Sequence, residues 1–311
     1  MDSKLTVIIV NYKSWDYLSK CLDSLIIQDS GMPNIIVVDN FSNDGKIQNF
    51  ESKYKSIKWI KLDYNSGFST ACNIGAKHAK SPWLLFLNPD SVVPKDCFKK
   101  LIPFCERNKE LKIISIRSKN AYLNKSFSHG FYFNFWTVTN FIRQFYILKK
   151  SNREIKTIDG KKVIMIGWVS GSFLLIRRND FKSIGGWDED FWMYAEDMDI
   201  CKRAYEKGMH PCVIYDWDYY HMHGGSSRKN KKIKLITKSE LISSKHIFID
   251  KHVKGFEKRL SHFLLIFETT VGLLPLFPFS SFHRSLLIRL IKYWSESLKS
   301  NSWKSLYRQK K

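Results

Sequence analysis

Cysteine is sparse in this 311-residue sequence: six cysteines are scattered along it, without a Cys-x-x-Cys pair or a regular framework. This pattern excludes a disulfide scaffold and a cysteine-based zinc site, because both need cysteines at recurring spacings. We therefore expect reduced, mostly buried thiols and a cytosolic compartment.

Acidic residues are also few relative to basic ones, with 29 Asp and Glu against 51 Lys and Arg and a formal net charge of +22. This excess of positive charge suits nucleic acid, anionic lipid or phosphorylated ligands. The net charge does not distinguish among these three classes of ligand, so the sequence motifs are needed to identify the function.

Long uninterrupted apolar runs are missing as well. The run over 7–10 is too brief for a signal-peptide core and polar residues follow it at once, so we expect a first strand there. The run over 262–279 contains Glu268 and is broken by Pro275 and Pro278, which leaves it short of the roughly 20 apolar residues of a spanning helix. Because basic residues flank this region, we expect it to lie on a membrane surface. The alternative is a helical cap on the preceding domain.

Hydrophobic residues make up 44% of the chain and aromatic residues 15%, which is enough for a sizeable core. The length is typical of about two domains. Short β-branched runs alternate with helical patterns at the start of the chain, which predicts an α/β fold with a mostly parallel sheet covered by helices on both faces. We expect strands at 6–10, 34–40, 56–62 and 83–90, and helices near 15–28, 69–79 and 94–108.

The rest of the chain has a different character. Residues 119–162 are aromatic, basic and irregular, and a strand is expected over 163–178. A basic linker begins at about 228 and is followed by mainly helical sequence. We therefore divide the chain into an α/β domain, 1–227, and a basic, helical C-terminal region, 228–311.

The most informative segment, 185–203, places carboxylates among large aromatic residues. Its acidic residues are Asp188, Glu189, Asp190, Glu196, Asp197 and Asp199. Carboxylates beside aromatics lose solvation, and a divalent cation, a sugar hydroxyl or an arginine such as Arg203 would offset that cost. The alternative is a helix N-terminus, where acidic residues favour the helix dipole.

Polar residues follow the expected strands at the edge where α/β sheets bind ligands. Asn11 follows the first strand, and Asp39 and Asn40 follow the second. Asp39 could accept a hydrogen bond from a nucleobase imide or a ribose hydroxyl, or could form an Asx-turn and helix cap. Gly67 stands where a helix containing Asn73 begins, which suits phosphate binding or a structural turn.

Two further motifs carry candidate metal ligands. Asn88 and Asp90 flank a proline just past the fourth strand, where Mg²⁺ or Mn²⁺ would bind a carboxylate together with phosphate oxygens. The alternative is an Asn-Pro-Asp turn. His221 and His223 lie in a glycine-rich segment that is either an exposed loop or the source of one imidazole completing the metal shell at Asp90.

Seven motifs together resemble family 2 glycosyltransferases, in their bacterial rhamnosyltransferase-type branch. In order they are VIIVNYKS, VVDNFSNDG, NSGFSTACNIG, LNPD, SGSFLLIRR, IGGWDEDFWMYAEDMDICKR and HMHGGSS, spread over roughly residues 4–250. The resemblance implies a GT-A fold and transfer of a sugar, such as rhamnose, from a dTDP- or UDP-sugar to a hydroxyl with inversion. It also implies a glycan or lipid-linked acceptor in bacterial surface polysaccharide synthesis. Nucleotide-sugar binding would then fall in 1–118, and acceptor binding and catalysis in 119–227.

The resemblance also implies roles for individual residues. Donor contacts would come from Asn11, Asp39, Asn40, Gly67, Asn73 and Asn88. Asp197 would be the general base supported by Glu196 and Asp199, Asp90 and His221 would hold the metal, and Trp187 and Asp188 would line the acceptor cleft. The first acid of the family's metal motif is Asn88 here, so metal affinity would depend more on Asp90 and the diphosphate. A QxxRW-type motif is missing from the sequence, which favours single sugar addition over polymer synthesis.

Two other classes of function stay open at this stage. A basic nucleic-acid-binding protein would explain the charge but not the acidic cluster. A nucleotidyltransferase would need a Gly-rich basic loop after the first strand, where this chain has NYKSWD. We expect instead that the positive charge docks the protein on the anionic inner face of the cytoplasmic membrane, as a cytoplasmic, peripheral enzyme.

Overall fold

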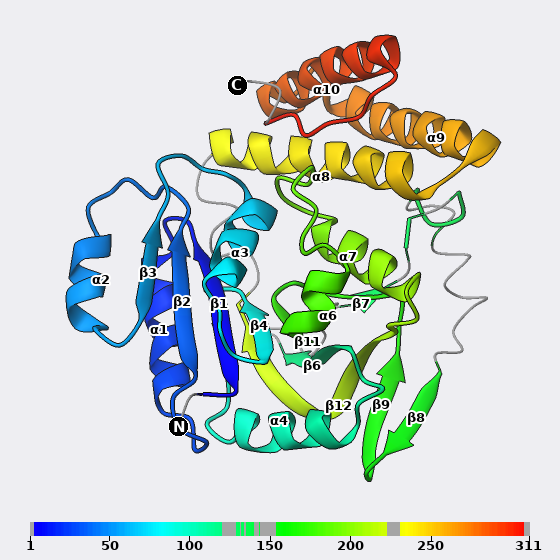
Figure 1. The fold of residues 1–311 in the computed structure, drawn as a ribbon. Helices are drawn as coiled ribbons and strands as arrows, with labels where there is room; N and C mark the ends of the chain where they lie inside the picture. Colours follow the sequence, from blue (N-terminus) through cyan, green and yellow to red (C-terminus); the bar gives the residue numbers. More distant parts are fainter. Residues whose placement is uncertain are drawn as a thin grey trace. The chain divides into compact units, whose positions relative to one another are not determined.

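The computed structural model describes residues 3–119, 129–130, 132–133, 135–139, 143, 154–222 and 231–307. The chain forms two compact units (Figure 1). The first, called here the sheet unit, comprises 1–130, 153–188 and 197–226. The second, the helical unit, comprises 131–152, 189–196 and 227–311. The expected division at 227 is therefore close to one boundary, but the helical unit also takes in residues 189–196 from the middle of the acidic segment.

The first half of the sheet unit is parallel, in the strand order β3-β2-β1-β4. Side chains on both faces of β1 and β4 are buried, as the near-continuous apolar sequences of these strands predict. The strands are β1 (Leu5–Asn11), β2 (Asn34–Asp39), β3 (Lys58–Lys61) and β4 (Trp83–Leu87), and the helices are α1 (Trp15–Ile26), α2 (Ile47–Lys53) and α3 (Phe68–Lys77). The expected alternation of strands and helices is confirmed here.

The second half makes the sheet mixed. β11 (Phe173–Arg177) runs antiparallel to β4 and to β6 (Ile113–Lys119), and β6 then pairs in parallel with β12 (Pro211–His221). The remaining elements of this half are β5 (Ser91–Val92), β7 (His129–Gly130), β8 (Ile155–Ile158), β9 (Lys161–Met165), β10 (Trp168–Val169), α4 (Cys97–Arg107), α6 (Arg178–Ser183) and α7 (Glu196–Tyr205). The single strand expected over 163–178 is wrong, because the chain turns between β9, β10 and β11 and each of them pairs with a different partner.

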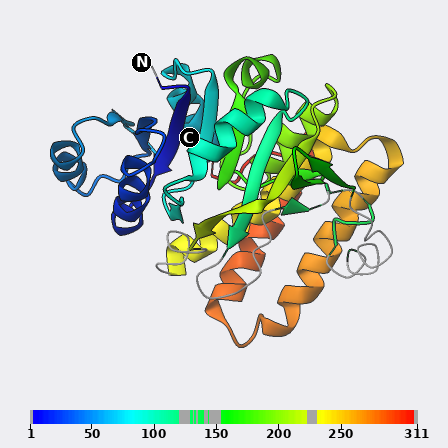
Figure 2. The same ribbon diagram turned by 90° about the horizontal axis from the view of Figure 1, so that it is seen from below.

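The helical unit consists of three long helices that pack on one another. α9 and α10 run side by side in Figure 2. They are α8 (Lys231–His252), α9 (Gly255–Leu273) and α10 (Ser281–Ser300), with a short 3-10 turn η1 (Leu274–Leu276) between the last two. α9 ends before Pro275, as expected from the missing N–H and the steric demands of proline.

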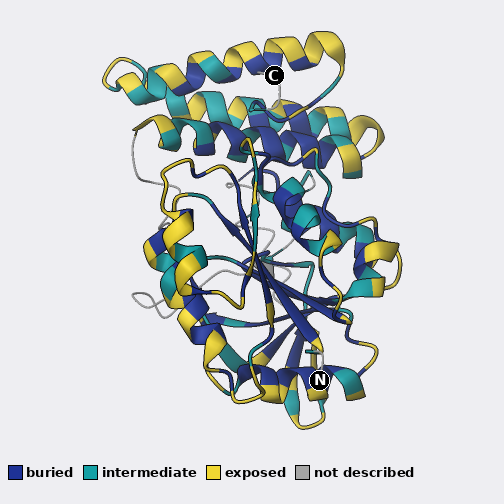
Figure 3. Ribbon diagram, turned by 60° about the vertical axis from the view of Figure 1, so that its left-hand side comes forward, coloured by how far each residue is buried: buried dark blue, intermediate teal, exposed yellow. Residues whose placement is uncertain are grey.

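Figure 3 shows buried residues along the strands and exposed residues on the outer sides of the helices. Among the described residues, one helical stretch, Gly255–Leu276, has the length and composition to cross a membrane. The sequence alone predicts a shorter apolar run, over 262–279. The helix begins earlier, at Gly255, and so adds further apolar residues such as Phe256 and Leu260.

Candidate active site

The carboxyl ends of β1 and β2 bring Asn11 and Asp39 side by side, in register across the parallel pair. The Asn11 amide Nδ2 donates to Asp39 Oδ1 at 3.0 Å, and the backbone N–H of Ser42 donates to Asp39 Oδ2 at 3.1 Å. Both side chains are buried. Hydrogen bonds therefore join the carboxyl ends of β1 and β2 at the edge of the sheet where α/β folds bind ligands.

Asn40 connects this edge to the start of α3. Its Oδ1 accepts from the backbone N–H of Ser66 at 2.8 Å, and its Nδ2 donates to the carbonyl of Gly67 at 3.2 Å. Gly67 has φ of 86°, a left-handed conformation that favours glycine, and it is the N-cap of α3. The predicted phosphate-binding turn is thus a helix N-terminus held in place by Asn40.

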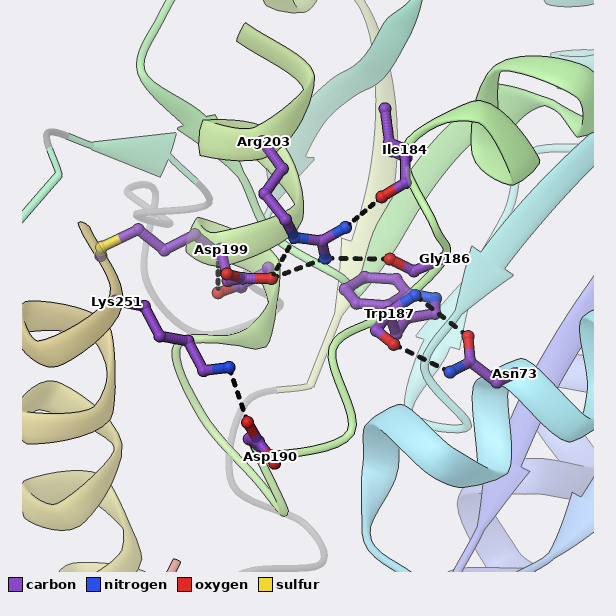
Figure 4. Close-up of polar contacts among 10 residues, drawn as sticks. Asn73, Ile184, Gly186, Trp187, Asp190, Asp199, Arg203 and Lys251 are labelled. Atoms are coloured by element: carbon purple, nitrogen blue, oxygen red, sulfur yellow. Dashed lines mark hydrogen bonds and ion pairs between the residues drawn. The ribbon is translucent and has the colours of Figure 1, made fainter. Parts of the chain in front are cut away.

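Asn73 and Trp187 do not have the predicted geometry for donor and acceptor contacts. The Asn73 amide donates to the carbonyl of Trp187 at 2.8 Å and accepts from its N–H at 3.0 Å, which fixes that stretch of backbone (Figure 4). The Trp187 side chain is only 1% exposed and packs edge-on against Phe68 and Phe86. The expectation that Trp187 offers a face to a sugar ring is therefore wrong, because core aromatics surround the indole.

Asp90 and His221 meet, although 131 residues separate them. The His221 Nε2 lies 3.0 Å from Asp90 Oδ1 and 3.4 Å from the amide nitrogen of Asn88. Both ring and carboxylate are buried. β12 creates this contact, since it shifts register between Ile214 and Asp218 and then pairs with β5, placing His221 opposite Ser91.

An imidazole nitrogen and a carboxylate oxygen facing each other at 3.0 Å are suitable ligands for a divalent cation. Across the part of the chain that the structure describes, no group of three or more His, Cys, Asp or Glu side chains could hold a metal ion. The pair therefore fits an ion that takes its other ligands from a bound diphosphate and water, which is typical of Mg²⁺ sites. It does not fit an all-protein cage.

Asp197 lies near the start of α7 with a half-buried carboxyl group. Its Oδ1 accepts from the backbone N–H of Met198 at 2.8 Å, and its Oδ2 faces the N–H of Gly171 at 3.4 Å. Burial raises the pKa of Asp197 to about 6, although these N–H groups favour the charged form and lower the pKa. A carboxyl group with this pKa is ionised at neutral pH and still basic enough to take a proton.

The turn at residues 170–172 connects Asp197 to the Asp90 loop, defined here as residues 88–90 between β4 and β5, within the sheet unit. The carbonyl of Ser172 accepts from the backbone N–H of Asn88 at 3.2 Å, while the adjacent Gly171 faces Asp197. The residues on either side of Asp90, Asn88 and Ser91, thus contact the same short turn as Asp197. The sequence alone assigns no role to this turn, although the turn lies in the SGSFLLIRR motif.

A second residue that sequence reasoning missed is Tyr219. Its hydroxyl lies 2.8 Å from Ser172 Oγ, and its ring stacks on His221 with centroids 6.2 Å apart. Burial raises the pKa of Tyr219 to about 12, so the phenol stays neutral. Its position two residues before His221 on a strand puts both side chains on one face, which was the available signal.

The other acidic residues of the predicted site, Asp188, Glu196 and Asp199, have different surroundings from those of Asp197. Asp199 is fully buried and pairs with Arg203, whose guanidinium also donates to the carbonyls of Ile184 and Gly186 (Figure 4). Asp199 therefore ties α7 to the loop before Asp188 through Arg203, and Asp188 is itself half-buried. Glu196 is buried at the first position of α7. His223, Gly224 and Ser226 lie outside the described residues.

A Rossmann-like sheet with Asn11, Asp39 and Asp90 at the carboxyl ends of its parallel strands is the architecture of the GT-A fold. The sequence model of Glycosyl transferase family 2 matches residues 6–185, more than half of the chain, and the chain belongs to this family. It is an enzyme that transfers sugars. The nucleotidyltransferase and nucleic-acid-binding interpretations are thereby set aside.

Relatives and solved structures agree with this assignment. The rhamnosyltransferase WbbL of Escherichia coli K12 is 28% identical over 248 residues, which cover 75% of this chain and 89% of WbbL. The N-acetylglucosaminyl-diphospho-decaprenol L-rhamnosyltransferase of Mycobacterium tuberculosis H37Rv is 26% identical over 234 residues, covering 67% of this chain and 72% of that protein. The crystal structure of S. aureus TarS 1-349 has the same fold, with a TM-score of 0.53 and 18% identity over 97% of this chain and 92% of that chain.

Proposed function

We propose that this protein transfers a hexose, with rhamnose the first candidate, from a dTDP- or UDP-sugar to a hydroxyl of a glycan or lipid-linked acceptor in bacterial surface polysaccharide synthesis. One observation carries the reaction type: a half-buried carboxyl group, Asp197, contacts the same turn as Asn88 and Ser91, which flank Asp90 of the Asp90–His221 pair. The sugar and acceptor classes are supported by the rhamnosyltransferases to which the chain is similar.

In this mechanism Asp197 takes the proton of the acceptor hydroxyl as its oxygen attacks the anomeric carbon. The bond from that carbon to the diphosphate breaks on the opposite side, so the anomeric configuration inverts. A sugar hydroxyl is a weak nucleophile without such a base, and general base catalysis typically contributes 10²–10⁴-fold. Because burial raises the pKa of Asp197 to about 6, the carboxylate is a better base than an ordinary aspartate.

Asp90 and His221 are the residues that would hold a divalent cation, Mg²⁺ or Mn²⁺, with Asn88 beside them. A cation bound there would supply positive charge for the departing diphosphate. Asn11, Asp39 and Asn40 would position the nucleoside, and the N-terminus of α3 at Gly67 would face the phosphates. Asp188 remains the candidate for acceptor contact at the loop that follows Trp187.

We further propose that the helical unit docks on the anionic inner face of the cytoplasmic membrane. Large apolar side chains are exposed along α9, η1 and α10, and Figure 3 shows the exposed sides of these helices. They include Phe256, Phe263, Phe267, Val271, Leu274, Ile288, Ile291 and Leu298, and Phe279 is exposed between η1 and α10. Residues 231–307 also carry fourteen lysines and arginines against five acidic residues. An exposed apolar face within a strongly basic unit is complementary to an anionic bilayer, where a lipid-linked acceptor would reside.

A thermal-shift panel of nucleotide sugars, with and without Mn²⁺, tests the donor assignment directly, with dTDP-rhamnose tried first. A ligand that binds the native state raises the unfolding temperature, and the rise grows with the ratio of ligand concentration to Kd. We expect the true donor to raise it further when Mn²⁺ is present. If no nucleotide sugar shifts the unfolding temperature while single-stranded RNA does, the proposal is wrong.

A further inference from the structure

The loop formed by residues 189–196, called here the 189–196 loop, belongs to the helical unit by its contacts, although both of its ends continue into the sheet unit. Lys251 of α8 forms an ion pair with Asp190 at 2.6 Å (Figure 4). The Ser244 hydroxyl, also on α8, donates to the carbonyl of Met193 at 2.7 Å. The loop is therefore attached to α8 at two points.

A third attachment comes from the end of the chain. Trp192 is 5% exposed, and its ring stacks on Tyr307 with centroids 4.3 Å apart and planes at 25°. Stacked aromatic pairs stabilise a fold by more than the burial of their apolar surface alone provides. Tyr307 and Trp192 are 115 positions apart, so only the folded helical unit brings them together.

The C-terminal tail, defined here as residues 302–307, is itself fixed on α8. The carboxylate of Glu240, which is fully buried, accepts from the backbone N–H of Tyr307 at 2.6 Å and from the Ser305 hydroxyl at 2.8 Å. The Trp303 ring stacks on His246 of α8 and on His262 of α9, with centroids 4.2 and 4.3 Å apart. The tail therefore presents Tyr307 to the 189–196 loop from a rigid base.

The loop needs such support because it ends in a strained backbone. Tyr194 and Ala195 are consecutive residues with φ of 71° and 63°, in the left-handed region that residues with a β-carbon disfavour. Conformations of this kind persist where the surrounding structure holds them, and they cluster at functional sites. Asp197 follows two residues after Ala195, at the second position of α7.

We propose that α8 and the C-terminal tail position Asp197, by holding the 189–196 loop in its left-handed conformation and so fixing where α7 begins. Tyr307, Ser244 and Lys251 are then positioning residues that act through the loop. This inference rests on the proposed role of Asp197 as general base, and it adds a function for the C-terminal region besides docking on a membrane.

The first test replaces Tyr307 in the full-length protein and measures kinetics with a water-soluble acceptor. Tyr307→Ala should lower kcat roughly 10-fold or more with little change in the KM of the donor, because misplacing a catalytic group slows the chemical step. Tyr307→Phe keeps the stacked ring and should restore kcat. Lys304→Ala is the matched control, since Lys304 is an exposed residue of the same tail. A fall in kcat of equal size in Tyr307→Phe, or none in Tyr307→Ala, overturns the proposal.

The second test asks whether the C-terminal tail offsets the backbone strain at Tyr194 and Ala195. Glycine adopts positive φ without the penalty of a β-carbon, so Ala195→Gly should recover part of the kcat lost in Tyr307→Ala. Identical kcat values for Tyr307→Ala with and without Ala195→Gly would contradict the role of strain.

The third test needs no activity, so it separates this inference from the proposed function. Amide hydrogen exchange across 189–196 should accelerate in Tyr307→Ala and stay as in the unmodified protein in Lys304→Ala. Unchanged exchange in Tyr307→Ala overturns the inference even if the enzyme is a rhamnosyltransferase. Faster exchange in a protein that transfers no sugar from any nucleotide sugar would overturn only the proposed function.

Discussion

The Nε2 atom of His221 lies 3.0 Å from Oδ1 of Asp90, and both side chains are buried. Asp90 follows β4, and His221 ends β12 on the other side of β11 and β6 in the strand order. The short strand β5 closes that distance by pairing with the end of β12. The contact brings an imidazole nitrogen and a carboxylate oxygen together at the sheet edge where the donor diphosphate is proposed to bind.

Replacing either partner should weaken metal-supported donor binding. Asp90→Asn and His221→Ala each remove a ligand, so both should raise the Mn²⁺ concentration that gives half-maximal activity, by about 10-fold or more. Activity titrated against Mn²⁺ at saturating donor measures this change. His210→Ala is the control, because His210 is exposed and away from the Asp90 loop in sequence. Unchanged Mn²⁺ dependence in both variants would remove the metal assignment.

Asp197→Asn keeps the shape of the side chain and removes its basicity. Turnover should fall about 10²–10⁴-fold, since that is the usual contribution of a general base. Donor binding, measured by thermal shift with the nucleotide sugar, should survive. Asp29→Asn, at an exposed position of the sheet unit, should change neither quantity. Sugar transfer at the normal rate by Asp197→Asn would show that another group takes the proton.

The raised pKa of Asp197 also predicts two pH dependences. The carboxyl group must be ionised to act as a base, so kcat should rise with pH through about 6 and then level off. Stability should change in the opposite direction. The folded state holds this proton up to about pH 6, whereas the unfolded chain releases it near 3.8, the ordinary pKa of an aspartate, so the contribution of Asp197 to stability falls as pH rises through this window.

Asp197→Asn tests the stability half of this argument, because the amide has no charge to bury. The variant should unfold at a higher temperature than the unmodified protein at pH 7.5, and the difference should vanish near pH 4. Calorimetry at the two pH values measures it. A variant that is less stable at pH 7.5 would mean that the carboxylate gains more from its N–H donors than burial costs it.

The exposed apolar face of the helical unit predicts binding to lipid. Phe263→Ser combined with Phe267→Ser removes two rings that are 61% and 58% exposed, so sedimentation with vesicles rich in anionic lipid should fall several-fold while the unfolding temperature is retained. Ile27→Ser, at a 63% exposed position of the sheet unit, is the matched control. Equal sedimentation with anionic and neutral vesicles would remove the electrostatic part of this proposal.

Several features of the site were accessible from sequence for a definite reason. Asn11 and Asp39 follow apolar strands joined by a helix, and parallel strands in such units end at the same edge, so their proximity follows from local pattern alone. Asp90 follows another strand of the same parallel set. Turn residues such as Gly67 could be placed because positive φ favours glycine.

Other features could not be predicted because local pattern does not encode them. An aromatic residue next to acidic residues can line a cleft or fill the core, and the side chains of Phe68 and Phe86 decide that Trp187 does the latter. Asn73 likewise has its amide engaged by a backbone segment 114 residues away. The 170–172 turn became informative only when its neighbours in space were known.

The amino-acid sequence by itself determined the parallel strands, the helices between them and the family to which the chain belongs, since these depend on short-range periodicity and on motifs in a fixed order. Tertiary structure decided the pairing of Asp90 with His221, the raised pKa of Asp197 and the attachment of the 189–196 loop to the C-terminal tail. Each of these depends on distances and desolvation between residues far apart in the chain, which only packing creates.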